Sequence, residues 1–192
     1  MSDRQEKSRK VIRLGTHGED YGSWMSNPVF YMVGGLTVLA ALLAVLSFAV
    51  FHSFVLGILC VMIVAVLLAL LGWITWIRRQ YSFDGGRIME RVHQTILFHI
   101  DYDGKGTLLD VGCGSGALSI RAALIWQETK VVGIDYWAAV YNYSQTLCEK
   151  NAASEGAGDR CTFYHGDANK LDFPDESFDA VVSNYVYHNI TG

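Results

Sequence analysis

The stretch LLDVGCGSGALS, residues 108–119, decides the fold of this chain. A short apolar run predicts a strand at 107–111, and a second apolar run predicts a helix at 117–127. The glycines between them let the backbone turn tightly and let a ligand lie against the main chain. Free N–H groups at a helix start also suit a carboxylate or a phosphate. We therefore predict a ligand-binding turn between this strand and this helix.

The pattern continues on the carboxyl side of this turn. Strands are predicted at 130–135, 161–165 and 178–184, with a helix at 137–153. Strands that alternate with helices indicate parallel pairing and a doubly wound α/β sheet. Asp135 ends the second strand, where a carboxylate can accept hydrogen bonds from both hydroxyls of a ribose. Before the first strand, an amphipathic helix is predicted from Arg87 onward.

Three ordered motifs carry a family resemblance. LLDVGCGSGALS resembles the first motif of the class I S-adenosylmethionine-dependent methyltransferases, in which an acidic residue precedes the first glycine by two places, as Asp110 does. VVGIDYW, residues 131–137, is similar to the second motif, and residues 165–190 are similar to the third and fourth segments. The resemblance covers roughly residues 82–192 and implies a Rossmann-like fold with S-adenosylmethionine as cofactor.

The resemblance also implies roles for individual residues. The amino-acid end of the cofactor would lie over the glycine-rich loop, near Asp110. Asp167 would accept from the adenine amino group, the main chain of Ala168 would face the adenine ring, and Tyr136 would pack on it. The implied cofactor site comprises Asp110, Gly112, Cys113, Gly114, Gly116, Asp135, Tyr136, Asp167, Ala168 and Asn184.

The candidate catalytic residue is His188, which follows the fourth strand. Its pKa range suits a general base for a protonated acceptor. The competing interpretation is that His188 packs the strand end or caps the next helix. The methyl acceptor and the oligomeric state stay open.

Two other functions stay open at this point. Gly112, Gly114 and Ala117 also fit the G-x-G-x-x-A pattern of an NAD-dependent oxidoreductase, although Asp110 and the segment 166–168 favour the methyltransferase. The family fold continues beyond the fourth strand, so we expect the chain to be C-terminally incomplete, with strand order 3-2-1-4. The second alternative is therefore a truncated, inactive cofactor-binding module.

A long apolar block precedes this α/β pattern in the chain. Residues 21–77 contain no Asp, Glu, Lys or Arg, so all 34 charged residues lie in the other 135, about 25%, as in ordinary globular domains. Two runs of 24 residues, 28–51 and 54–77, would each span about 36 Å as helices, enough to cross a hydrocarbon core of about 30 Å. Only two residues separate them, which predicts an antiparallel transmembrane hairpin rather than a signal peptide or a buried helix pair.

Basic residues predict the orientation of this hairpin. They cluster before the first span and directly after the second, and the turn has none, so the positive-inside rule places both ends in the cytoplasm. We predict a cytoplasmic basic tail at 1–27, a hairpin at 28–77, a linker at 78–86 and a partial methyltransferase domain at 87–192. The predicted protein is a multi-pass cell-membrane enzyme that methylates a small-molecule or lipid acceptor.

Composition argues against other partners. The net charge of −4 gives no basic footprint for a nucleic acid. The four cysteines lie far apart without a C-x-x-C pair, so their spacing suggests neither a metal site nor a disulfide framework.

Overall fold

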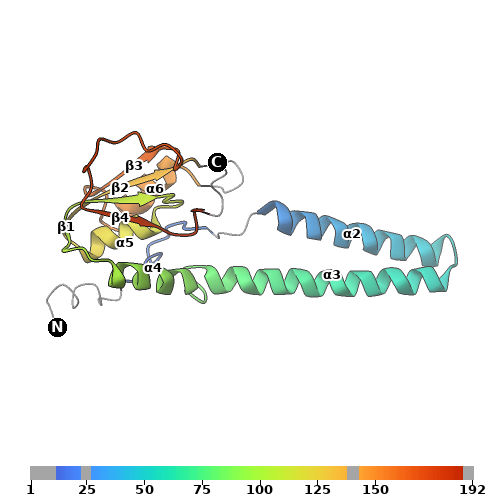
Figure 1. Cartoon of the computed structure of the whole chain (residues 1–192). Helices are drawn as coiled ribbons and strands as arrows, with labels where there is room; N and C mark the ends of the chain where they lie inside the picture. Colours follow the sequence, from blue (N-terminus) through green and yellow to red (C-terminus); the bar gives the residue numbers. More distant parts are fainter. Residues whose placement is uncertain (1–11, 23–26, 138–142, 188–192) are drawn as a thin grey trace. The chain divides into compact units, whose positions relative to one another are not determined.

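The structure is a computed structural model that describes residues 12–22, 27–137 and 143–187 (Figure 1). The chain forms two compact units. One holds the residues up to Gly22 and from Tyr81 onward, and the other holds residues 23–80. We call them the α/β unit and the hairpin unit, and describe each by itself.

The hairpin unit consists of helices α2 (Asn27–Ala49) and α3 (Phe54–Tyr81). At one end, Arg78 Nη2 donates to Asn27 Oδ1 at 2.7 Å. At the other end, the Phe48 ring packs on Gly57, where a Cβ atom would lie 2.4 Å from the ring. These contacts establish the predicted antiparallel pair of apolar helices. Helix α3 runs four residues beyond the predicted end of the second span, into the expected linker.

The sheet of the α/β unit has four parallel strands in the order β3-β2-β1-β4, as predicted. Its strands are β1 (Lys105–Val111), β2 (Glu128–Asp135), β3 (Cys161–His165) and β4 (Ala180–Ser183). β3 has the predicted bounds, whereas β4 is shorter than the predicted strand at 178–184. Their carboxyl ends lie at one edge, where open parallel sheets bind ligands.

Side chains of successive strand residues point to opposite faces of the sheet. Leu108 joins the larger apolar cluster, which also receives side chains from helices α4 (Ile88–His99), α5 (Ala117–Ile125) and α6 (Gln145–Ser154). Leu109 and Val111 face the other way and form a smaller cluster with Ile134. Within the described residues, loop side chains such as Phe173 and Phe178 pack against that smaller cluster.

Helix α6 begins later than predicted. The sequence predicts a helix from residue 137, but the described helix begins at Gln145, and residues 138–142 lie outside the described part. Trp137 has a φ of 45°, which is left-handed, and its N–H donates to Asp135 Oδ1 at 2.7 Å. Ser144 is extended and its hydroxyl accepts from the N–H of Leu147, as an N-cap does. The helix therefore starts at this cap.

Residues 12–22, which we call the N-terminal segment, pack into the core of the α/β unit. Leu14 is fully buried and Tyr21 is 5% exposed. The Tyr21 ring lies 4.8 Å from the Phe83 ring, centroid to centroid. The sequence places these residues in a basic tail. The structure differs because Leu14 and Tyr21 join the same apolar cluster as helices α4 to α6.

Candidate functional site

The loop between β1 and α5 has a backbone that only glycine adopts readily. Gly112, Gly114 and Gly116 have φ values of 74°, 58° and 81°. A Cβ atom at Gly112 would also lie 2.2 Å from the Val186 side chain. The N–H groups of Gly112 and Cys113 donate to the carbonyl oxygen of Ile134 at 2.7 and 3.0 Å. The loop is thereby held against the end of β2.

Asp135, the last residue of β2, faces this loop. Its Oδ2 accepts from the N–H of Gly114 at 2.8 Å, and its Oδ1 accepts from the N–H of Trp137 at 2.7 Å. An ionised carboxylate has about four acceptor positions, so these two bonds leave roughly two for a ligand. Asp135 is half-buried, which keeps this capacity accessible. The arrangement can accept from two neighbouring hydroxyls of a ligand that lies on the loop.

Asp110 has a different environment from Asp135. It is 1% exposed, and its Oδ2 accepts from the Ser119 hydroxyl at 2.6 Å, which links β1 to α5. The pKa of Asp110 is raised from 3.8 to about 7, mainly by burial and also by the charge of Asp135, while the hydrogen bonds with Ser119 oppose this shift. Asp110 therefore lies behind the loop, where its local contacts tie the strand to the helix.

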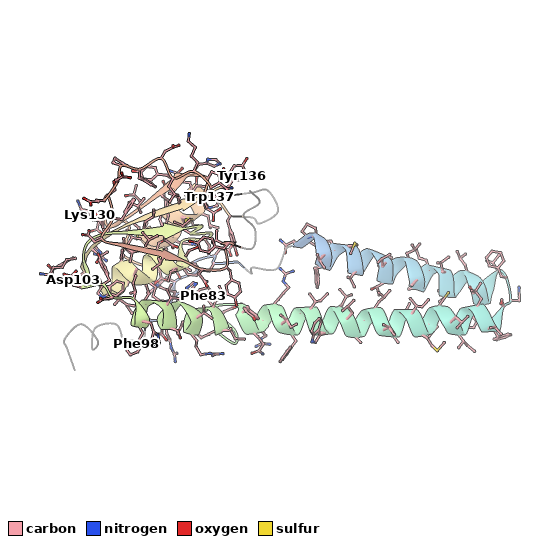
Figure 2. All side chains as sticks on the ribbon, viewed as in Figure 1. Phe83, Phe98, Asp103, Lys130, Tyr136 and Trp137 are labelled. Atoms are coloured by element: carbon pink, nitrogen blue, oxygen red, sulfur yellow. The ribbon has the colours of Figure 1, made fainter. Side chains whose placement is uncertain are left out.

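Two aromatic residues, Tyr136 and Trp137, directly follow Asp135 in the chain and are labelled in Figure 2. Tyr136 is 64% exposed, and its ring centroid lies 5.1 Å from that of His165. Trp137 Nε1 donates to the carbonyl oxygen of Gly114 at 2.8 Å. An exposed ring beside an acceptor for hydroxyls offers a flat apolar surface for a base.

The other predicted site residues lie near the same sheet edge or outside the described residues. Asp167 is exposed, and its Oδ1 accepts from the backbone N–H of Asn169 at 2.8 Å. Ala168 packs against the smaller apolar cluster, and Asn184 is half-buried directly after β4. Cys113 is buried, and burial raises the pKa of its thiol well above the ordinary value. His188, the candidate base, lies outside the described residues.

Sequence reasoning missed the N-terminal segment as part of this region. The carbonyl oxygen of Tyr21 accepts from the Ser115 hydroxyl at 3.2 Å. Asn151 Nδ2 donates to the carbonyl oxygens of Asp20 and Ser115, at 2.9 and 3.1 Å. Asn151 is 1% exposed, so it joins α6, the N-terminal segment and the glycine-rich loop from inside the core. These contacts join residues far apart in the chain, so no local sequence pattern predicts them.

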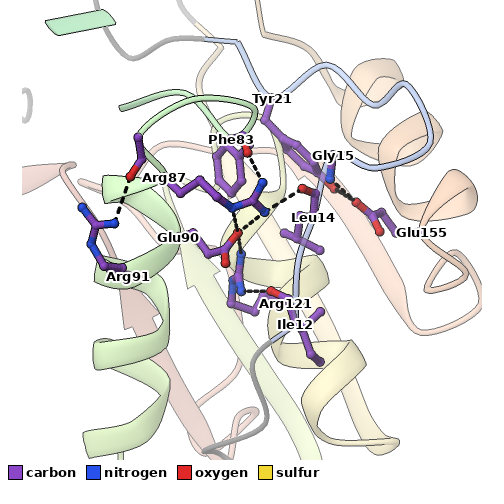
Figure 3. Close-up of polar contacts among 11 residues, drawn as sticks. Ile12, Leu14, Gly15, Tyr21, Phe83, Arg87, Glu90, Arg91, Arg121 and Glu155 are labelled. Atoms are coloured by element: carbon purple, nitrogen blue, oxygen red, sulfur yellow. Dashed lines mark hydrogen bonds and ion pairs between the residues drawn. The ribbon is translucent and has the colours of Figure 1, made fainter. Parts of the chain in front are cut away.

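A buried ionic cluster holds the other end of the N-terminal segment (Figure 3). Arg121 on α5 is fully buried, donates to the carbonyl oxygen of Ile12 and lies 3.6 Å from Glu90 Oε2. Arg87 bonds to the same carboxylate and to the carbonyl oxygen of Leu14. Burial lowers the pKa of His93 on α4 to about 3, and the charge of Arg121 adds to this shift. The segment is thus fixed to both α4 and α5.

Known proteins are similar in sequence to this part of the chain. Residues 108–192, from β1 onward, match the sequence model of a family described as "Methyltransferase domain". The matched segment, 85 of the 192 residues, is similar to the class I methyltransferases that its three motifs resemble. The residues present in the methyltransferase domain fit S-adenosylmethionine, the cofactor of this class, because Asp135 keeps acceptor positions free beside a glycine-rich loop that lets a ligand approach the main chain.

Curated relatives of the methyltransferase domain have diverse names. A probable cobalt-precorrin-6B C(15)-methyltransferase (decarboxylating) of Pyrobaculum aerophilum is 46% identical over 67 residues, which is 34% of this chain and 32% of the relative. The rRNA N(6)-adenosine-methyltransferase metl-5 of Caenorhabditis elegans is 31% identical over 50% of this chain and 42% of its own. A demethylmenaquinone methyltransferase of Roseiflexus castenholzii is 34% identical over 45% of this chain and 33% of its own. The matches thus span about a third to two fifths of these relatives.

Proposed function

We propose that this chain is a membrane-anchored methyltransferase that uses S-adenosylmethionine to methylate a small-molecule or lipid acceptor at the membrane. The observation that carries the proposal is the Asp135 carboxylate at the carboxyl end of β2, bonded to Gly114 of the loop and to Trp137. This arrangement supports a nucleoside ligand whose ribose faces Asp135. Tyr136, with its exposed ring beside Asp135, would pack against the base.

Bound S-adenosylmethionine supplies a sulfonium-linked methyl group that is intrinsically electrophilic. The task left to the protein is positioning, which alone can supply much of the rate of an in-line transfer. In this proposal the loop 112–116 supports the amino-acid end of the cofactor, and Asp135 fixes the ribose. The half-buried Asn184 after β4 would stand at the acceptor side, and His188 is the proposed base for a protonated acceptor.

The hairpin unit supports membrane anchoring. Its two helices are long and apolar enough to cross a membrane, and only 22% and 11% of their most apolar windows are buried. A core helix of a soluble protein would be mostly buried. With Arg78 and Arg79 in the last turn of α3, the positive-inside rule favours a cytoplasmic α/β unit.

Membrane anchoring and some of the relatives support the proposed class of acceptor. The relative named for demethylmenaquinone supports an apolar acceptor. The relative named for rRNA fits less well, because a net charge of −4 is not the basic balance that is typical of nucleic-acid binding. An acceptor dissolved in the bilayer would be concentrated near an anchored domain.

The first test is cofactor binding by the full chain in detergent micelles, measured by titration calorimetry. Asp135→Ala removes the acceptor for two charge-assisted hydrogen bonds worth about 1.5–3 kcal/mol each, so affinity for S-adenosylmethionine should fall at least roughly a hundredfold. Asp172→Ala, at an 80% exposed side chain, is the matched control and should bind as the parent does. Unchanged affinity in Asp135→Ala, or tight NADH binding without S-adenosylmethionine binding, would refute the assigned site.

The second test concerns the acceptor. Methyl transfer from radiolabelled S-adenosylmethionine to a total lipid extract should exceed transfer to the aqueous extract of the same cells. Cofactor binding without transfer to either extract would favour the inactive binding module.

A further inference from the structure

A cluster of possible metal ligands lies outside the proposed cofactor site. His17 and Glu19 of the N-terminal segment and Glu155, directly after α6, each offer one ligand atom, and these atoms all lie within 4.8 Å of one another. The three residues come from two distant parts of the chain. Their sequence spacing therefore has no metal-binding pattern.

Glu19 gives an independent sign that a cation is needed there. Its side chain is 0% exposed, whereas its residue as a whole is half-buried, so the exposed part is backbone. Oε2 accepts from the N–H of His17 at 2.8 Å, but Oε1 is buried and has no hydrogen-bond partner. A buried carboxylate oxygen without a partner costs free energy, and a cation is its most effective partner.

Nearby charges add to this need. Glu155 Oε1 accepts from the N–H of Gly15 at 2.7 Å and from the Tyr21 hydroxyl at 3.1 Å (Figure 3). The carboxylates of Glu19 and Glu155 thus face the same small volume.

The distances suit a small divalent ion. His17 Nδ1 lies 3.7 Å from Glu19 Oε1. Two ligands of a tetrahedral Zn²⁺, at bond lengths of about 2.0–2.2 Å, stand about 3.4 Å apart. His17 Nδ1 shares a hydrogen bond of 3.2 Å with the Thr16 hydroxyl, which the ion would replace. The His17 side chain is 67% exposed and can rotate towards the carboxylates, and solvent can supply a fourth ligand. One imidazole with two carboxylates favours a transition metal over Mg²⁺, which prefers oxygen ligands alone.

We infer that His17, Glu19 and Glu155 form a Zn²⁺-type divalent metal site that fastens the N-terminal segment to the end of α6. The ion partners the orphaned Glu19 oxygen and neutralises the two carboxylates. The neighbouring residues Asp20 and Tyr21 contact Asn151 and Ser115, so the ion stabilises the segment where it meets the glycine-rich loop. The site is separate from the proposed cofactor site.

The experiment titrates Zn²⁺ alone into the metal-stripped full chain in detergent micelles, by calorimetry and by thermal unfolding. We expect one saturable site per chain and a midpoint temperature that rises with Zn²⁺ concentration. Glu19→Gln should weaken Zn²⁺ binding at least roughly tenfold, and His17→Ala should do the same. Mg²⁺ at equal concentration should leave the midpoint unchanged.

Two features make the result decisive. Without metal, Glu19→Gln should be as stable as the parent or more so, because it removes a buried charge beside Glu155; a merely structural Glu19 would give a loss instead. His99→Ala, at an exposed histidine of α4, controls for adventitious binding and should keep the parent affinity. Equal Zn²⁺ affinity in the parent and Glu19→Gln, or no saturable site in the parent, would overturn the inference. Neither readout depends on methyl transfer or on cofactor binding.

Discussion

The two units of this chain use apolar side chains in opposite ways. In the α/β unit, Leu108 is fully buried between strands and helices. In the hairpin unit, Val38 and Val66 are 61% and 68% exposed, and side chains of this kind project outward along both helices (Figure 2). The same residue types therefore gain their stability from protein contacts in one unit and require an apolar surrounding in the other.

The two units also differ in where the hydrogen-bond partners of their polar side chains lie. In the hairpin helices, the hydroxyls of Thr37, Ser47 and Thr75 each donate to the carbonyl oxygen four residues earlier. In the α/β unit, Asn151 and Arg121 bond to segments more than 100 residues away. Hydrogen bonds within the same helix suit a surrounding without water, because the polar groups of such a helix need no partner outside it. Hydrogen bonds between distant segments specify one tertiary fold.

The largest expected effect comes from a charge in the middle of each hairpin helix. Val38→Arg with Val66→Arg should make membrane insertion less favourable by about 5–7 kcal/mol, since a central arginine costs about 2.5–3.5 kcal/mol. The measurement is the fraction of chain released from membranes by alkaline carbonate. Thr162→Arg with Tyr164→Arg, at exposed positions of β3, is the control and should stay membrane-bound. Equal release of both pairs would contradict a lipid-facing hairpin.

A smaller effect concerns the pH dependence of the α/β unit. The pKa of Asp110 is about 7 in the fold, above its ordinary 3.8, so the unfolded chain releases this proton first and the free energy of unfolding falls as pH rises towards 7. In the Asp110→Asn variant, the free energy of unfolding does not show this fall, because asparagine carries no titratable proton. Relative to the parent, it should gain about 2 kcal/mol between pH 5 and pH 7, because the slope of 1.36 kcal/mol per pH unit declines as the folded protein titrates near pH 7, and little more above pH 7.

Urea unfolding followed by tryptophan fluorescence at each pH checks this prediction. Asp172→Asn, at an exposed side chain, should follow the parent at every pH. A constant offset between Asp110→Asn and the parent from pH 5 to pH 8 would show that the buried carboxylate does not titrate in this range.

A matched pair of leucine truncations gives the third contrast. Leu108→Ala removes a fully buried side chain and should lower the free energy of unfolding of the α/β unit by about 2–5 kcal/mol. Leu68→Ala, at a 55% exposed position of α3, should change it by less than about 0.5 kcal/mol. Urea unfolding in the same detergent measures both. Equal losses would mean that the two units unfold together.

The regular parts of the fold could be predicted from local sequence. The strand at 161–165 has its predicted bounds, and the glycines at 112, 114 and 116 all have left-handed φ values. In both cases the deciding signal lies within a few residues: an apolar run in one, and the conformational freedom of glycine in the other.

The parts that sequence reasoning missed depend on distant partners. Leu14 ends a mostly apolar stretch at 11–14 that is too short to show a periodicity, and Tyr21 stands alone, so nothing local distinguishes them from a solvated tail. Glu90 and His93 are polar residues on the inner face of α4, buried because Arg121 and the N-terminal segment surround them. For α6, a signal was present in Ser144, a good N-cap, but the apolar run from residue 137 concealed it.

The attachment of the N-terminal segment also sets an order of events during synthesis. Gly15 and Glu155, joined by a hydrogen bond, lie 140 positions apart. At a translation rate of about 5–20 residues per second, roughly 7–28 s separate their appearance. During that time Leu14 and Tyr21 lack the complete core that they enter in the fold, while both apolar helices are synthesised. The α/β unit can therefore close only after the hairpin is made, and its earliest residues are among the last to fold.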